Sequence, residues 1–171
     1  MQSKDAPMYS VAETPFTTDQ LHALVAAAVD GSDRAYRPYS NFSVGCAIMT
    51  TDGSLFKGCN IETANYDGSH GEEIAVGAMV MGGHRDPVLY MCMGGLKGQP
   101  KYVIASCGKC RQVMMEFASL SDREVWCVKN IPDGTSGNSG YTLQKLTELL
   151  PGHFGPADVG VDLDEHRRPK T

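Results

Sequence analysis

Residues 42–62 read FSVGCAIMTTDGSLFKGCNIE, and this stretch decides the fold class together with the helical pattern that follows it. Two β-prone runs, Phe42 to Met49 and Leu55 to Ile61, are separated by a turn that contains Asp52-Gly53. An Asp-Gly pair between two such runs is typical of a β-hairpin. Further along, EEIAVGAMVMGG places alanine and methionine at helical positions, which predicts a helix that ends at Gly82-Gly83.

Strand and helix patterns alternate on both sides of this stretch. Upstream, residues 17–36 carry apolar side chains at helical spacing, with threonine or aspartate available to cap the start. Downstream, residues 88–93 and 102–105 indicate two short buried strands or two parts of one interrupted strand. The remaining elements are expected to be a helix at 107–118, a strand at 124–130, a loop at 132–140 and a short amphipathic helix at 142–150 that Pro151 stops. This alternation predicts a layered α/β domain.

Length and composition are those of one globular domain. The chain has 171 residues, of which 42% are hydrophobic and 20% are charged, so it can bury a core without disulfides. We expect a loose N-terminal arm at 1–16, a single domain at 17–160 and a charged, disordered tail at 161–171.

Charge and hydropathy exclude several classes of partner. With 15 basic and 20 acidic residues the formal charge is -5, which disfavours a nucleic acid polymer. No run approaches the ~20 apolar residues that span a membrane, and the N-terminus lacks a secretory pattern. We therefore expect a cytoplasmic protein whose six cysteines are thiols or metal ligands. The cysteines expected to be buried small hydrophobes are Cys46, Cys59, Cys92 and Cys127.

Cys107 and Cys110 form a C-x-x-C motif at the start of the helix expected at 107–118. Residues three apart share one face of a helix, and the free N–H groups of a helix N-terminus stabilise thiolates. The motif alone leaves three interpretations open: a redox pair, half of a structural zinc site, or two packed thiols.

His70 opens the other expected helix, within residues 66–76, YDGSHGEEIAV. Two helix starts above one sheet edge would bring His70 to Cys107 and Cys110, and three ligands leave a fourth position for water, as in a catalytic zinc site. Glu72 is placed to carry protons there. By itself, His70 would be a turn or capping residue and Glu72 a solvated acid at a helix start. Together, H-x-E and C-x-x-C match the pattern of zinc-dependent base deaminases, except that Ser106 replaces the proline of that pattern.

Four separated segments, in the same order, resemble the small homotetrameric cytidine deaminases. They are AYRPYSNFSVGCAI, GCNIETANY, CGKCRQVMMEF and LLPGHFGPADV, and the resemblance runs from about Ala35 to Val159. It implies a three-layer α-β-α fold with a mixed sheet of about five strands. It also implies a zinc-dependent hydrolase of pyrimidine salvage, which converts cytidine to uridine or 2′-deoxycytidine to 2′-deoxyuridine. The implied assembly is a homotetramer.

The resemblance assigns roles to individual residues. It implies that zinc is held by His70, Cys107 and Cys110, and that Glu72 shuttles protons. The residues that it implies for substrate binding are Asn60 and Glu62 at a ribose hydroxyl, Phe42 beside the base, Ala105 through its carbonyl at the amino group, Phe154 from a neighbouring subunit over the base, and Tyr66 reaching an adjacent subunit's site.

This chain departs from that family at its metal site. Tetrameric members usually have cysteine at the position of His70 and arginine at the position of Glu73. Three thiolates leave zinc with one surplus negative charge, whereas two thiolates and a neutral imidazole leave none. We therefore expect the two changes to compensate each other. Alternatively, Glu73 accepts the other ring N–H of His70, or faces solvent or Arg111. The segment at 60–72 is also one residue shorter than the family norm.

Three functions remain open at this point. The first is deamination of cytidine or 2′-deoxycytidine. The second is deamination of a modified cytosine nucleoside, such as a nucleoside antibiotic or an N4- or 5-substituted cytidine, which the shortened segment keeps open. The third is a non-catalytic, zinc-stabilised nucleoside-binding protein, which Glu72 argues against because a structural site needs no acid beside an open position.

Overall fold

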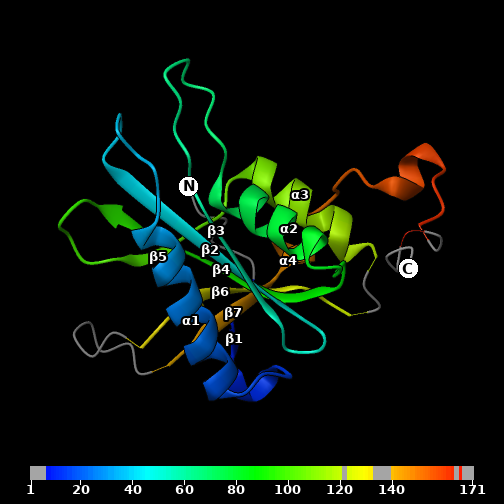
Figure 1. Ribbon diagram of the computed structural model, residues 1–171. Coiled ribbons are helices and arrows are strands. Elements are labelled where there is room, and N and C mark those ends of the chain that lie inside the picture. The colour runs from blue at the N-terminus through cyan, green and yellow to red at the C-terminus, as the bar shows by residue number, and fades with distance from the viewer. Residues whose placement is uncertain (1–6, 121–122, 133–139, 164–165, 167–171) are drawn as a thin grey trace.

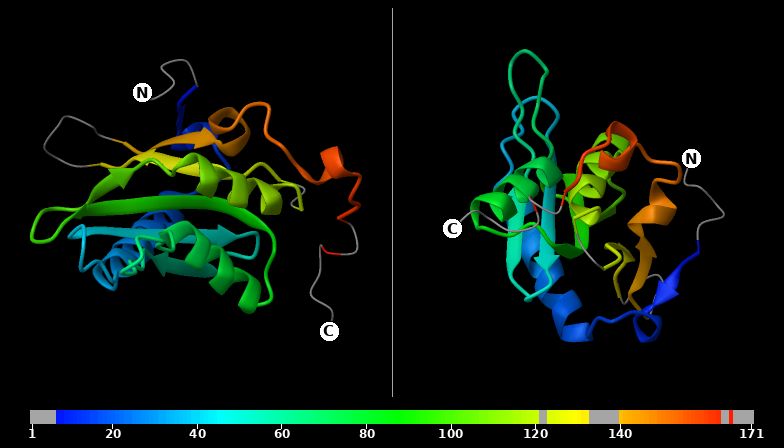
Figure 2. Two further views of the ribbon diagram at one scale, coloured as in Figure 1. Left: turned by 90° about the horizontal axis from the view of Figure 1, so that it is seen from above. Right: turned by 90° about the vertical axis from the view of Figure 1, so that its right-hand side faces the viewer.

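The computed structural model describes residues 7–120, 123–132, 140–163 and 166, and these form three layers (Figure 1). A mixed sheet lies between helix α1 on one face and helices α2, α3 and α4 on the other, as the two further views also show (Figure 2). The helices are α1 (Thr18–Asp33), α2 (Gly71–Met81), α3 (Gly108–Ala118) and α4 (Leu146–Leu149), with short 3-10 turns η1 (Val11–Glu13) and η2 (Pro156–Val159).

The described residues form a seven-stranded sheet whose long central strand is β4. In chain order the strands are β1 (Tyr9–Ser10), β2 (Phe42–Thr50), β3 (Leu55–Cys59), β4 (Pro87–Leu96), β5 (Tyr102–Ile104), β6 (Trp126–Asn130) and β7 (Thr142–Lys145). Their spatial order is β1-β7-β6-β4-β2-β3, and β5 pairs with β4 off this path. Among these pairs β4 and β6 are parallel and the others antiparallel.

Strands β5 and β6 share one edge of β4 at different levels. β6 pairs with Leu89 and Tyr90, whereas β5 pairs further along, from Cys92 to Gly94. The chain therefore leaves β5 beside the middle of the sheet and turns directly into α3. This geometry places the start of α3 over the central strand.

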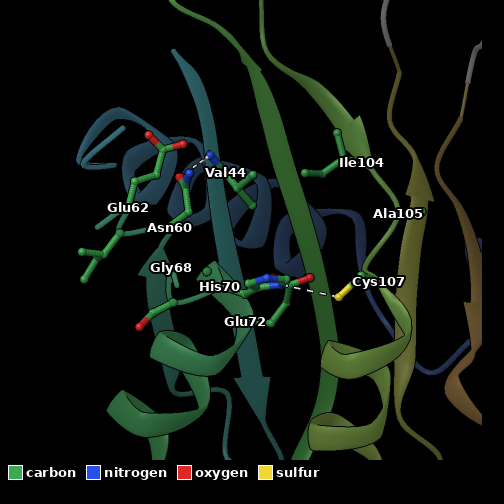
Figure 3. Close-up of a pocket in the computed structure, with 12 residues that line it drawn as sticks. Val44, Asn60, Glu62, Gly68, His70, Glu72, Ile104, Ala105 and Cys107 are labelled. Carbon is green, nitrogen blue, oxygen red and sulfur yellow. Dashed lines mark hydrogen bonds between the residues drawn. The ribbon is translucent and has the colours of Figure 1, made fainter. Parts of the chain in front are cut away.

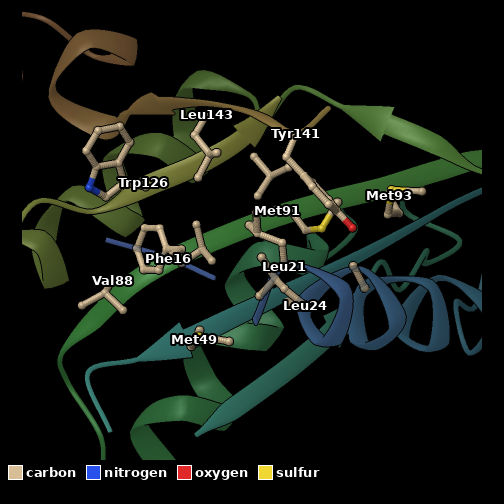
Figure 4. Close-up of a cluster of buried hydrophobic side chains, with 14 residues drawn as sticks. Phe16, Leu21, Leu24, Met49, Val88, Met91, Met93, Trp126, Tyr141 and Leu143 are labelled. Atoms are coloured by element: carbon tan, nitrogen blue, oxygen red, sulfur yellow. The ribbon is translucent and has the colours of Figure 1, made fainter. Parts of the chain in front are cut away.

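Two apolar cores hold the layers together. On the α1 face, Leu21 and Leu24 pack against the sheet with Met91 and Leu143 (Figure 4). Complete burial of each of these leucines contributes about 1.5–3 kcal/mol. The core of the opposite face lies beneath α2 and α3 and is formed by Cys46, Ile48, Ala75, Val76, Met79, Tyr90, Cys92, Met114, Met115, Val125, Cys127 and Leu146.

The predicted α/β class, hairpin and three main helices are confirmed. Strands β2 and β3 pair from Gly45 with Cys59 to Met49 with Leu55, and Gly53 takes the positive φ of 86° that the turn requires. The residues expected to form one interrupted strand or two short strands form the separate strands β4 and β5, which pair antiparallel.

The expected strand count was too low, because seven strands are present in the described chain instead of about five. The helix predicted at 142–150 is wrong in its first half: Thr142–Lys145 is strand β7, and the helix is limited to Leu146–Leu149. β7 extends alongside β6, and this pairing buries Leu143 and Gln144. The tertiary pairing overrides a helical pattern of only nine residues.

The other unexpected strand lies in the segment expected to be a loose arm. Tyr9 and Ser10 form β1, which pairs with β7. The Tyr9 ring meets the Trp126 ring edge-on at 5.1 Å, and its hydroxyl donates to Glu148 Oε1 at 2.8 Å. Residues 9–13 are therefore docked, contrary to the expectation. Residues 1–6, most of the expected loop at 132–140 and most of the expected tail at 161–171 lie outside the described residues.

No helix among the described residues is both long and apolar enough to cross a membrane.

Candidate metal centre and adjoining cavity

The candidate site lies where α2 and α3 begin, side by side over the same end of the sheet (Figure 3). His70 is the N-cap of α2 and Cys107 is the N-cap of α3, both with extended backbone angles. Cys110 lies one turn into α3 and is buried. Because β5 leads straight into α3, and β3 leads through the segment at 60–69 into α2, residues far apart in sequence meet here.

Gly58 of β3 determines how closely α2 approaches the sheet. A Cβ atom at this position would lie 2.3 Å from the Ala75 nitrogen and 2.4 Å from the Gly71 carbonyl oxygen, which are both backbone atoms. Only glycine accommodates so close an approach. This contact places the first turn of α2, and with it His70 and Glu72.

Three potential ligand atoms converge at the two helix starts. His70 Nδ1 lies 3.2 Å from Cys110 Sγ and 3.4 Å from Cys107 Sγ, and the two sulfur atoms are 3.4 Å apart. In a tetrahedral zinc site with Zn–S near 2.3 Å and Zn–N near 2.1 Å, neighbouring ligand atoms are about 3.6–3.8 Å apart. The observed cluster is slightly tighter than that, so this donor set fits zinc with a small expansion.

The surroundings of Cys110 disfavour the charged form of its thiol when no cation is present. Burial raises the pKa of the Cys110 thiol, and the charge of Glu72 and the neighbouring Cys107 thiol raise it further. The protein alone therefore opposes ionisation of this thiol. A bound dication supplies the missing positive charge and reverses that preference.

A cavity of about 320 Å³ adjoins the cluster (Figure 3). Glu72, only 5% exposed, lines it beside His70 and Cys107. The other predicted site residues that line it are Asn60, Glu62 and Ala105. A cavity with one buried acid, a three-donor cluster and polar groups on the far wall can hold a small polar ligand against a metal.

Asn60 and Glu62 are already engaged with the protein. Asn60 accepts from the Val44 amide at 2.8 Å and donates to the Phe42 carbonyl at 3.0 Å. Glu62 accepts from the Ser40 hydroxyl and from the amides of Ser40 and Tyr39. The Ser40 hydroxyl contributes most to lowering the pKa of Glu62. A carboxylate has about four acceptor sites, and an amide has a second N–H and a second lone pair, so both side chains retain capacity for a ligand.

Three predicted residues do not line this cavity. Phe42 is not among the residues that line it, and its ring faces Tyr102 at 6.5 Å between centroids. Tyr66 is 86% exposed, has a φ of 60° and, with Tyr39, lines an adjoining hollow that shares Glu62 and Gly68 with this cavity. Phe154 is 62% exposed. One chain therefore brings the candidate metal ligands together with Glu72, Asn60, Glu62 and Ala105, but these three aromatic side chains do not line the same cavity.

Glu73 pairs with a residue that the sequence did not indicate as its partner. Its Oε1 lies 2.9 Å from the Lys109 ammonium, and its Oε2 accepts from the His70 backbone N–H at 3.1 Å. The pKa of Glu73 is lowered, mainly because its carboxylate accepts a hydrogen bond from Lys109. Its contacts are therefore with Lys109 and the His70 backbone instead of the His70 ring or Arg111, and Glu73 caps α2 and joins the starts of α2 and α3.

The apolar wall of the cavity was also missed by sequence reasoning. Val44, from β2, and Ile104, the last residue of β5, both line it. In the sequence both are ordinary strand residues. The only signal for this role was that Val44 lies two residues from Phe42 and Ile104 lies next to Ala105.

Fold and cluster together define a class: three-layer α/β proteins with a buried glutamate and a His/Cys/Cys cluster that could hold a metal ion, at two adjacent helix starts. Residues 18–127 match the family model described as the cytidine and deoxycytidylate deaminase zinc-binding region. The chain belongs to this family of deaminases.

Individual relatives agree with that assignment. The cytidine deaminase of Halalkalibacterium halodurans is 35% identical over 139 residues, which cover 80% of this chain and 95% of the relative. That of Mycobacterium tuberculosis is 37% identical, covering 77% and 87%. The crystal structure of cytidine deaminase from Burkholderia pseudomallei superposes with a TM-score of 0.62 at 33% identity, covering 81% of this chain and 100% of that one.

Proposed function

We propose that this protein hydrolyses the amino group of cytidine and 2′-deoxycytidine, giving uridine or 2′-deoxyuridine and ammonia, as a step of pyrimidine salvage. One observation carries the proposal: the buried Glu72 lies in a cavity directly beside His70 and the two cysteines. Relatives named cytidine deaminase, 35–37% identical over most of the chain, support the same reaction.

The metal would be zinc, held by His70, Cys107 and Cys110. Two sulfur donors and one imidazole suit zinc, and three protein ligands leave one position open. When bound, zinc lowers the pKa of a coordinated water to about 7 and so supplies a nucleophile at neutral pH.

Glu72 would move the protons. It first accepts a proton from the attacking water and transfers it to ring nitrogen N3, which makes carbon C4 electrophilic. After oxygen has added to C4, Glu72 would take the proton of the new C4 hydroxyl and pass it to the exocyclic amino group, so that the C4 carbonyl forms as ammonia leaves. The Ala105 carbonyl would orient that amino group by accepting one of its hydrogens, a role that no side-chain substitution removes.

Asn60 and Glu62 would bind the ribose. Each keeps a free donor or acceptor position after its contacts with the protein, and both line the cavity on the side away from the metal cluster. The contacts that hold them also reduce their freedom, so they would be oriented before the sugar arrives.

We further propose that the working enzyme is a homotetramer. Phe154 and Tyr66 are exposed in the single chain, which suits side chains that cover a neighbouring subunit's site, and Phe42 would line the base pocket of the assembled site. All six cysteines are free thiols, which suits a reducing, cytoplasmic location. Size-exclusion chromatography tests the assembly, and a monomer would remove Phe154 from the site.

A modified cytosine nucleoside is the second candidate substrate. The short segment before His70 contributes Gly68 and Ser69 to the cavity wall, where they would adjoin the substrate. A purely binding role has less support, because Glu72 serves no structural purpose beside an open metal position.

The test is deamination of a panel of cytosine nucleosides by purified zinc-loaded protein, followed by loss of cytosine absorbance. Glu72→Ala should abolish it, and Glu116→Gln, which alters an exposed glutamate of α3, should not. Activity of Glu72→Ala equal to that of the wild type would refute the mechanism. Turnover of substituted cytidines in preference to cytidine would favour the second substrate.

A further inference from the structure

A buried hydrogen bond lies directly beneath the turn that leads into Cys107. The Tyr90 phenol and the Ser106 hydroxyl are 3.1 Å apart. Tyr90 belongs to the central strand β4 and is 1% exposed, and Ser106 is 4% exposed. Ser106 occupies the position where the base-deaminase pattern has proline.

Ser106 faces the opposite way from its two neighbours. Ala105 and Cys107 both line the cavity, whereas Ser106 does not and is buried. Residues two apart in extended chain point to the same side, so the alternation follows from the backbone. Ser106 therefore anchors the turn from below, while its neighbours present a carbonyl and a thiol to the site.

The bond matters because both residues are buried. Burial is the main cause that raises the pKa of Tyr90 well above its usual value, which indicates how poorly the phenol is solvated. A buried hydroxyl without a partner is destabilising, so the bond to Tyr90 stabilises the position of the Ser106 hydroxyl. Tyr90 also pairs in register with Cys127 of β6, whose thiol is a second neighbour of the phenol.

We propose that Tyr90 and Ser106 form a positioning pair that holds the turn at 105–107, in place of the φ restraint that proline would supply. Proline would restrict the backbone φ at position 106. Here the Ser106 side chain is instead hydrogen-bonded to Tyr90 of the central strand. The pair keeps Cys107 Sγ at the distance that the cluster with His70 and Cys110 requires. Its consequence for catalysis rests on the proposed deamination, but its effect on metal retention does not.

The test compares Tyr90→Phe, Ser106→Ala and the double variant by the rate at which each zinc-loaded protein loses zinc to a colorimetric chelator. A hydrogen bond of ordinary net strength predicts about two- to tenfold faster release for each single variant. Because both changes remove one bond, the double variant should release zinc no faster than the faster single one. In turnover, kcat should fall by a similar factor while KM changes little.

Three further variants separate positioning from general destabilisation. Ser106→Thr retains the hydroxyl and should keep wild-type release. Tyr141→Phe removes the hydroxyl of another buried tyrosine, which belongs to the core on the α1 face, so it should leave zinc release unchanged whatever it does to the melting temperature. In the Tyr90→Phe background, Ser106→Pro should restore slow release, since proline then holds the turn without needing the phenol.

The proposal is overturned if Tyr90→Phe releases zinc at the wild-type rate, if the single effects multiply in the double variant, or if Tyr141→Phe accelerates release equally. A wild-type protein that binds no zinc would overturn it as well. If the wild type retains zinc but deaminates no cytosine nucleoside, the proposed function fails, and the release rates still decide whether the pair positions Cys107.

Discussion

Gly58→Ala should destabilise the fold and loosen the metal site together. The new Cβ would lie 2.3 Å from the Ala75 nitrogen, whereas ordinary contacts begin near 3.4 Å. Helix α2 would have to move by about 1 Å, because the obstructing atoms are backbone and cannot rotate away. Overpacking of this kind costs about 1–3 kcal/mol, and for a domain of this size each kcal/mol lowers the melting temperature by about 2–4 °C.

The same displacement should reach the chemistry. His70 and Glu72 lie in the first turn of α2, directly above this contact. A misplacement of about 1 Å can lower a rate by up to about 100-fold. Gly58→Ala should therefore release zinc faster and lose kcat beyond what the fraction unfolded explains.

Gly77→Ala is the matched control on the same helix. A Cβ at Gly77 meets nothing within 4 Å, and the position is exposed. Alanine there should stabilise α2 by about 0.5–1 kcal/mol and leave zinc release unchanged. The two substitutions should therefore shift the melting temperature in opposite directions. Differential scanning calorimetry of the zinc-loaded proteins measures both shifts. Gly58→Ala melting at or above the wild type, with normal zinc release, would refute the packing argument.

Other changes have equally definite outcomes. Glu72→Gln should lower kcat by at least about 100-fold, as loss of a general acid and base does, while zinc content measured by atomic absorption stays at the wild-type level. His70→Cys should retain zinc more weakly against a chelator, and adding Glu73→Arg should restore part of the loss; a double variant no better than the single one contradicts charge compensation. The pKa of Asp52 is lowered to about 2, mainly because its carboxylate accepts a hydrogen bond from the Ser54 backbone N–H. Since this folded-state pKa lies below the unfolded value near 3.9, the carboxylate's stabilisation is present above pH ~4 and lost towards pH 2. In urea titrations, Asp52→Asn should therefore show a flatter dependence of stability on pH in that window.

Much of the candidate site could be anticipated because its chemistry is local in sequence. The C-x-x-C spacing places Cys107 and Cys110 within one helical turn, and His70 and Glu72 are two residues apart. Each pair is therefore brought together by backbone geometry alone. That the two pairs meet required only that α2 and α3 begin at the same end of the sheet, which an alternating α/β pattern favours.

The contacts that hold the site were not accessible in this way. Glu73 and Lys109 are 36 residues apart, and nothing in either local pattern indicates that they pair. The same is true of Tyr90 and Ser106. Such partners depend on how far each helix is rotated and how closely it lies on the sheet, which are set by packing over the whole interface.

The amino-acid sequence by itself determined the α/β class, the hairpin, the three main helices and the donor types available for a metal, because these depend on periodicity and residue chemistry. The tertiary structure alone decided that Thr142–Lys145 is a strand, that Tyr9 docks beside it, and how near the His70 ring lies to the two thiols. Short segments with ambiguous patterns adopt the conformation that buries their apolar side chains and pairs their backbone groups with a neighbour, and that neighbour exists only in the folded chain.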